Sequence, residues 1–221
     1  MEFHNLLENL TAFIDSRICS HLIVEDSSGD NLLIYAARHQ RSELVTFLID
    51  RGVLVNHQNT NGETALSVAC ENGDEIMVEL LLTYGVDIDH ADLAGHNALM
   101  RASRTGNIEI IHLLIRFGAD MNNIDHQQDS ALIIACRSGQ TSTAITLVQQ
   151  NVLLLNGQGW RGQTSLMVAC NLGLLEVVAC LLDYGANLNL KDLLGNGCLE
   201  AAICNQQKDI IKLLITHGLD I

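Results

Sequence analysis

The sequence predicts an all-α solenoid of stacked helix–turn–helix units joined by short hairpin loops. The prediction rests on a leucine followed three residues later by an alanine, a pair that recurs along the chain. The leucines are Leu33, Leu66, Leu99, Leu132, Leu166 and Leu199, and the alanines are Ala36, Ala69, Ala102, Ala135, Ala169 and Ala202. The steps are 33 residues, with one of 34 between the fourth and fifth copies. Such a period is typical of arrays whose units bury their apolar faces on one another.

The clearest copy, residues 62–92, reads as two short helices and a turn. Thr64 can cap a first helix, and Gly73 suits the left-handed residue that ends it. Asp74 can cap a second helix with a wide apolar stripe, which Gly85 ends. Helices of about 10 residues are not stable alone in water. We therefore expect the copies to stabilise one another by stacking.

This unit resembles the ankyrin repeat. Three segments are similar to the family pattern G-x-T-P-L-H-x-A-A-x-x-G-x-x-x-I-V-x-L-L-L-x-x-G-A-D-V-N: GETALSVACENGDEIMVELLLTYGVDID, GHNALMRASRTGNIEIIHLLIRFGADMN and GQTSLMVACNLGLLEVVACLLDYGANLN. The chain has no proline, so T-P-L-H becomes TAL, NAL, SAL or TSL, which a first helical turn accepts. The resemblance implies an ankyrin repeat domain over residues 27–221, with approximate repeats 27–58, 59–91, 92–124, 125–158, 159–191 and 192–221.

Three segments depart from the regular unit. Residues 1–26 precede the repeats, and their helical spacing of apolar residues predicts an N-terminal helical cap or, alternatively, a helix that docks on a partner. In the first and last repeats, Gln40 and Gln206 replace the glycine that ends the first helix. In the fourth repeat, Asn151 replaces a glycine, and we expect it to take the left-handed turn there. The loop after it carries the extra residue and the sole tryptophan, Trp160.

Composition and motifs exclude several classes of function. A net charge of −14 would repel nucleic acid, and no apolar run is long enough to span a membrane. The seven cysteines include Cys70, Cys136 and Cys170 in one small-residue position, which predicts buried free thiols in a reducing compartment, the cytoplasm or nucleus. We find no metal-binding Cys spacing, phosphate loop or nucleophile turn. We therefore expect no enzyme, catalytic residue, metal or cofactor.

The family resemblance implies a protein–protein interaction module, a scaffold whose hairpins and first helices form a concave groove for a partner protein. We expect a monomer. Two alternatives stay open: an inhibitor that occludes a partner's active or binding site, and the targeting part of a longer multidomain protein or effector. Mapped onto this sequence, the groove positions are Asp30, Tyr35, Arg38, Glu63, Glu71, His96, Arg101, Arg104, Asp129, Arg137, Trp160, Arg161, Gln163 and Asn171.

Two of these residues have competing interpretations. Arg101 stands in an otherwise apolar row, so it either faces the groove or extends to solvent along its aliphatic stem. Trp160 either covers the irregular loop or serves as an aromatic anchor for a ligand.

Acidic residues are concentrated in the first half of the chain. Residues 1–95 contain 16 Asp and Glu against 4 Arg, whereas residues 96–221 contain 10 against 8 Lys and Arg. Arg38 and Arg104 are the register mates of Glu71 and are expected to flank it as ion pairs. Our hypothesis is that a basic segment of the partner crosses repeats 1–3 near Glu63, with an apolar part near Trp160. The alternative is a solvated acidic face.

Ankyrin repeats as a family are also substrates of an intracellular asparaginyl hydroxylase that acts on the hairpin asparagine. The matching positions are Asn122 and Asn189. Asn122 is the favoured candidate, because Asp120 precedes it by two residues.

Overall fold

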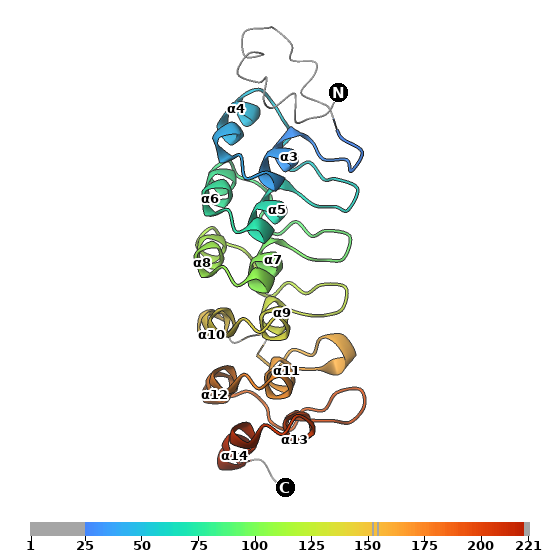
Figure 1. Cartoon of the computed structure of the whole chain (residues 1–221), viewed down its shortest axis with the longest axis vertical. Helices are drawn as coiled ribbons and strands as arrows, with labels where there is room; N and C mark the ends of the chain where they lie inside the picture. The colour runs from blue at the N-terminus through green and yellow to red at the C-terminus, as the bar shows by residue number, and fades with distance from the viewer. Residues whose placement is uncertain (1–24, 152, 154, 219–221) are drawn as a thin grey trace.

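The computed structural model describes residues 25–151, 153 and 155–218, and these form an elongated stack of helix pairs (Figure 1). The described residues contain 12 α-helices and no strand, which confirms the all-α solenoid. In Figure 1 the first helices of the pairs lie between the column of second helices and the hairpin loops. None of the helices described is long and apolar enough to cross a membrane.

Each repeat contributes one helix pair. The first helices are α3 (Leu32–Arg38), α5 (Ala65–Asn72), α7 (Ala98–Thr105), α9 (Ala131–Arg137), α11 (Ser165–Leu172) and α13 (Cys198–Cys204). The second helices are α4 (Val45–Asp50), α6 (Glu75–Thr83), α8 (Ile108–Arg116), α10 (Thr141–Gln150), α12 (Leu175–Asp183) and α14 (Lys208–Thr216). Short 3-10 turns cover Ser42–Leu44 and Trp160–Gly162. Each helix packs on its own partner and on its equivalents in the adjoining repeats.

The recurrent small residues explain why the first helices stack so closely. All six alanines of the repeat row, from Ala36 to Ala202, are 0% exposed. Polar caps set the start of the helices: the side chain of Thr64 accepts the Ser67 N–H, and that of Asn97 accepts the Met100 N–H. The apolar stripes of the repeats together form one continuous core along the stack.

The hairpin loops also stack directly on one another. The Leu93 N–H donates to the Asn61 carbonyl at 3.0 Å, and the His126 N–H donates to the Ala94 carbonyl at 3.1 Å. This close approach explains Gly62, whose φ is +76° and whose added Cβ would lie 3.0 Å from the Leu93 nitrogen. The loops therefore present a regular edge, with side chains held in fixed register.

The three irregular segments behave differently from one another. Gln40 and Gln206 adopt the left-handed conformation of the glycines they replace, with φ of 54° and 57°. The expectation for Asn151 is wrong, because its φ and ψ are −151° and 119°, which is extended backbone. The Asn151 side chain donates to Asn122 Oδ1 at 3.0 Å. Residues 1–24, which hold most of the expected cap, lie outside the described residues.

Candidate functional site

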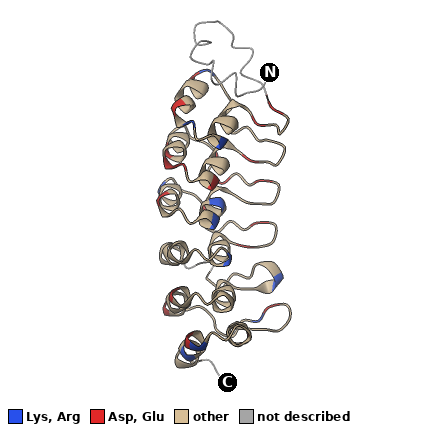
Figure 2. Cartoon of the chain, in the orientation of Figure 1, with Lys and Arg blue, Asp and Glu red and all other residues tan. Residues whose placement is uncertain are grey.

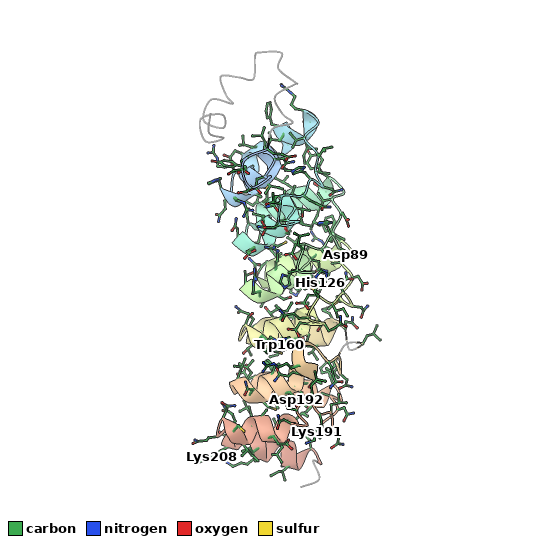
Figure 3. All side chains as sticks on the ribbon, turned by 90° about the vertical axis from the view of Figure 1, so that its right-hand side faces the viewer. Asp89, His126, Trp160, Lys191, Asp192 and Lys208 are labelled. Carbon is green, nitrogen blue, oxygen red and sulfur yellow. The ribbon has the colours of Figure 1, made fainter. Side chains whose placement is uncertain are left out.

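The surface formed by the first helices and the hairpin loops, here called the inner face, carries two columns of polar residues. Figure 3 shows the side chains from the loop side of the stack. The hairpin column is Asp30, Glu63, His96, Asp129, Gln163 and Asn196, and the helix column is Arg38, Glu71, Arg104, Arg137, Asn171 and Cys204. Charged members of both columns occur in the first four repeats, and Figure 2 shows the charges on the stack.

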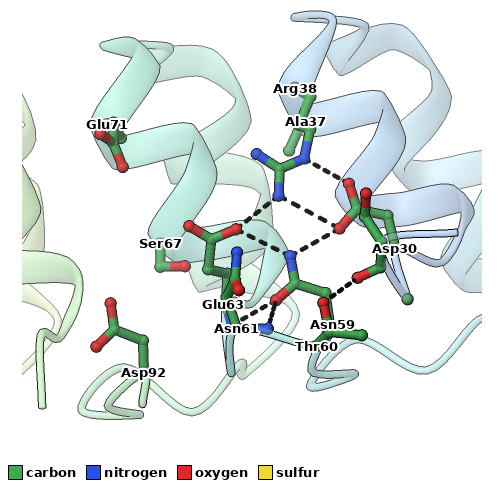
Figure 4. Close-up of polar contacts among 12 residues, drawn as sticks. Asp30, Ala37, Arg38, Asn59, Thr60, Asn61, Glu63, Ser67, Glu71 and Asp92 are labelled. Atoms are coloured by element: carbon green, nitrogen blue, oxygen red, sulfur yellow. Dashed lines mark hydrogen bonds and ion pairs between the residues drawn. The ribbon is translucent and has the colours of Figure 1, made fainter. Parts of the chain in front are cut away.

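In repeats 1 and 2, Arg38 joins the hairpin column into a network (Figure 4). Its Nε donates to Asp30, and its Nη2 donates to Glu63 Oε2 at 2.6 Å. Asn59 Nδ2 donates to both carboxylates, at 2.8 Å to Asp30 and 2.9 Å to Glu63. The hydrogen bond to Asp30 contributes most to a raised pKa of Arg38, and burial opposes it. The network links two repeats through groups with fixed geometry.

Arg101 is the centre of a second cluster. Its side chain is only 7% exposed and donates to Asp92 at 2.7 Å, to Glu63 at 3.0 Å and to Glu71. Extension into solvent, one of the two interpretations, is therefore wrong. Arg101 lies toward the inner face but is enclosed by three carboxylates. A buried charge needs such partners, because an unpaired ion loses its hydration without compensation.

Glu63 and Glu71, near which a basic partner segment was expected, are both paired within the chain. Glu71 accepts from Arg101 and, at 2.5 Å, from Arg104, so the expected Arg104 pairing is confirmed. The expected Arg38–Glu71 pairing is wrong, because Arg38 lies against Asp30 and Glu63 on the hairpins. Burial opposes ionisation of Glu63, but hydrogen bonds from Asn59 and Arg38 outweigh it and lower its pKa. Glu63 and Glu71 are thus each paired with arginines of this chain.

A third cluster joins repeats 4 and 5 around Asp129, which is 3% exposed. Asp129 accepts a hydrogen bond from Arg137 Nε and one from the Trp160 N–H, both at 2.8 Å. A Cβ on Gly159 would lie 1.9 Å from Asp129 Oδ1, so only glycine leaves room for this carboxylate. Trp160 is 43% exposed, and the guanidinium carbons of Arg161 and Arg137 lie 4.1 Å and 5.6 Å from the centroid of its ring. The role of Trp160 as an aromatic anchor stays a prediction.

A pocket of about 190 Å³ lies on the inner face between α7 and α9. His96 stands at its hairpin side, with Nδ1 3.5 Å from Asp92 Oδ2 and Nε2 3.4 Å from Asp125 Oδ2. Its remaining lining is Met100, Arg101, Arg104, Gln127, Asp129, Ile134, Arg137 and Ser138. Of the sequence-predicted residues, His96, Arg101, Arg104, Asp129 and Arg137 meet here. Tyr35 lies two repeats away, where its ring packs 4.3 Å from that of His39.

Sequence reasoning missed the residues that begin the hairpins. Asn59 and Asp92 start consecutive hairpins, and their side chains accept the N–H groups two and four residues later. The signal was present, since Asp or Asn recurs at this position in every repeat except the fifth, which has Gly159. These side chains hold the hairpins in shape. Asp92 also accepts a hydrogen bond from Arg101, and Asn59 donates to Asp30 and Glu63.

The remaining candidate groups are possible metal ligands, the cysteines and the hairpin asparagines. No set of three His, Cys, Asp or Glu in the described part of the chain is arranged to hold a metal ion. Cys70, Cys136 and Cys170 are buried and free, and burial raises the pKa of Cys136 to about 12. Asn122 and Asn189 are exposed on the hairpins, so their hydroxylation stays a prediction.

The fold and this face define a class of protein: a repeat array whose apolar surfaces stack internally while polar and aromatic groups are displayed along one side. The family model for ankyrin repeats matches in three copies, over residues 4–92, 77–154 and 150–221. The chain belongs to the ankyrin repeat family. Ankyrin repeats are general protein–protein interaction modules.

Similar curated proteins share only part of their length with this chain. Rabankyrin-5 from Mus musculus is 47% identical over 66 residues, which are 28% of this chain and 6% of that protein. The serine/threonine-protein kinase VIK from Arabidopsis thaliana is 33% identical over 72 residues, 33% of this chain and 16% of the kinase. The chain therefore matches a small fraction of these longer proteins.

Solved structures match over nearly the whole stack. The ankyrin repeat domain of Bcl-3, described as a unique member of the IkappaB protein family, superposes with a TM-score of 0.78 at 25% identity. That match covers 96% of this chain and 91% of the Bcl-3 chain. An ankyrin repeat domain from Acinetobacter baumannii AYE also gives a TM-score of 0.78, at 29% identity, over 84% of this chain and 97% of the other.

Proposed function

We propose that this chain binds a partner protein on its inner face, over repeats 3–5. The observation that carries the proposal is the pocket between α7 and α9 together with the exposed groups around it. Arg104 and Trp160 are 46% and 43% exposed, and Arg137 lies between them in the stack with 28% of its side chain exposed. Arginine and tryptophan are enriched among the residues that dominate binding energies in protein interfaces.

Because of the internal ion pairs, we place the proposed site over repeats 3–5 rather than over repeats 1–3. A basic partner segment there was expected to meet Glu63 and Glu71, but both carboxylates already hold arginines of this chain. The net charge of −14 still favours association with a partner whose overall surface is basic, because long-range attraction raises the encounter rate. We therefore retain a basic partner for steering and place its contacts further along the stack.

The test compares two bulky substitutions on opposite faces. Ser138→Trp fills the pocket on the inner face, whereas His112→Trp places the same side chain on α8, an exposed second helix. Affinity capture from a cell extract with mass spectrometry should recover a partner with the wild type and with His112→Trp but not with Ser138→Trp. Capture of the same partner by all three folded proteins would contradict binding on the inner face.

A second candidate function is that the array targets an activity housed in a longer protein. The observation that favours it is the small share of Rabankyrin-5 and of the VIK kinase that the chain matches.

Inhibition of the partner is a third candidate function. An activity assay on the captured partner, with and without this chain, separates inhibition from scaffolding. The buried free thiols support our placement of the protein in the cytoplasm or nucleus. The proposal treats the chain as a monomer, which light scattering at micromolar concentration would check.

A further inference from the structure

We propose that the pocket between α7 and α9 receives an acidic side chain, aspartate or glutamate, of the partner protein. This inference rests on the proposed function and adds the chemistry of one contact. Three features of the pocket support an acidic ligand: the order of charges along the helix column, the N–H groups left free on the arginines, and one buried donor without a partner.

Charges alternate along the helix column until they reach the pocket. Arg38, Glu71 and Arg104 follow one another in successive repeats, so Glu71 lies between two cations in sequence register. The next member is Arg137, so Arg104 and Arg137 lie one on each side of the pocket, and no carboxylate stands between them in the column. A carboxylate from a partner would continue the alternation and separate two like charges.

The two arginines have donors to spare. A guanidinium offers five N–H groups in a planar fork that suits a carboxylate. In the described structure, Arg104 makes one hydrogen bond, from Nη2 to Glu71 Oε1 at 2.5 Å. Arg137 uses Nε on Asp129 at 2.8 Å and Nη1 on Gln163 Oε1 at 3.2 Å, and its Nη2 contacts with Asp129 and the Trp160 carbonyl are longer, at 3.5 and 3.4 Å. One N–H of Arg137 Nη1 therefore has no partner among these contacts. Both side chains are partly exposed, so a ligand can reach them.

A buried donor in the same pocket also supports an anionic ligand. Arg101 lines the pocket and is 6% exposed, and its Nε is the one buried side-chain nitrogen or oxygen without a hydrogen-bond partner among the described residues. Buried donors in folded proteins are nearly always paired. Glu63, Glu71 and Asp92 offset the charge of this guanidinium, so the cationic groups that a ligand can reach are the partly exposed Arg104 and Arg137.

The acidic residues of the pocket are already satisfied. Asp125 accepts the N–H groups of Gln127 and Asp129 at 2.8 Å and faces His96. Asp129 is held by Arg137 and by the Trp160 N–H. A cationic ligand would find these carboxylates buried and already paired, with the partly exposed guanidinium groups of Arg104 and Arg137 opposing it, so the pocket favours an anion over a cation.

The test uses three short probe peptides that differ in one residue: acetyl-Gly-Glu-Gly-amide and its Gln and Lys counterparts. The guanidinium Nε–H signals of Arg104 and Arg137 are followed by NMR during titration of the whole chain. The Glu peptide should shift both signals and bind roughly tenfold more tightly than the Gln peptide, and the Lys peptide should leave them unmoved. Arg104→Gln should weaken binding of the Glu peptide about tenfold.

The matched control is Arg116→Gln on α8, which removes the same charge from an exposed side chain paired with Glu79 at 3.4 Å. It should leave binding of the Glu peptide unchanged. Equal shifts with Glu and Gln peptides, no shift with any peptide, or equal losses in both variants would overturn the acidic subsite. Failure of the proposed function looks different: in that case Ser138→Trp still captures the partner, whatever the peptides do.

Discussion

Replacing Arg101 by methionine removes the cation at the centre of the repeat 2–3 cluster while keeping an unbranched apolar side chain in place of the aliphatic stem. Glu63 and Asp92, which are 12% and 6% exposed, would then lose a shared guanidinium partner. Breaking a buried ion pair by removing one member costs about 3–5 kcal/mol. Glu63 keeps Arg38 and Asn59, and Asp92 keeps two backbone N–H groups, so we expect the lower end, about 3 kcal/mol.

Arg104→Met is the matched control on the same helix. Arg104 and its partner Glu71 are 46% and 40% exposed, and pairs in contact with solvent contribute about 0–1 kcal/mol because water screens them. Urea unfolding of wild type and both variants, followed by circular dichroism at pH 7, measures the two losses. Equal losses would refute the reasoning, since they would mean that the carboxylates around Arg101 are as well solvated as Glu71.

The difference in unfolding free energy between wild type and Arg101→Met should depend on pH, because the same contacts shift the pKa values of the carboxylates. For Asp92, burial opposes ionisation, but the His96 N–H and Arg101 outweigh it and lower its pKa, and the pKa of Glu63 is lowered as well. A carboxylate with a lowered folded-state pKa adds stability that is present above its unfolded pKa of about 4. That stability is lost as the pH falls through the folded-state values. The gap between wild type and Arg101→Met should therefore be full at pH 7 and shrink below about pH 4.

Three further predictions concern single positions. Gln40→Gly should stabilise the chain by about 1 kcal/mol in thermal unfolding, because a φ of 54° strains a residue with a Cβ; an unchanged or lower midpoint would contradict this. Gly159→Ala should displace Asp129 from the backbone N–H that it caps, lower stability by about 1–3 kcal/mol and alter the emission of the sole tryptophan; unchanged emission and stability would argue against the cap. Under native conditions at pH 8, Cys204, which is exposed, should be alkylated on the order of 100-fold faster than buried Cys136, as measured by mass spectrometry; comparable rates would show that the core around Cys136 opens readily.

Much of this protein follows from its sequence. The 33-residue period set the number of helix pairs, and glycine and cap residues set where most helices begin and end. These features are local or periodic, so a one-dimensional pattern contains them. The register also identified the polar columns, including Asp129 and Arg137, because equivalent positions in a solenoid face the same side.

Only the tertiary structure decided which of those side chains pair. Arg38 pairs with Glu63 rather than with Glu71, because a long side chain can reach several register positions. Arg101 pairs with Glu63 and Asp92 on the hairpins and with Glu71 on α5. Asn151 is extended rather than left-handed, and the sequence alone did not indicate this because asparagine accepts both conformations. Register fixes the face on which a residue lies, whereas the burial and the distances that determine its ionic partner arise when neighbouring repeats stack.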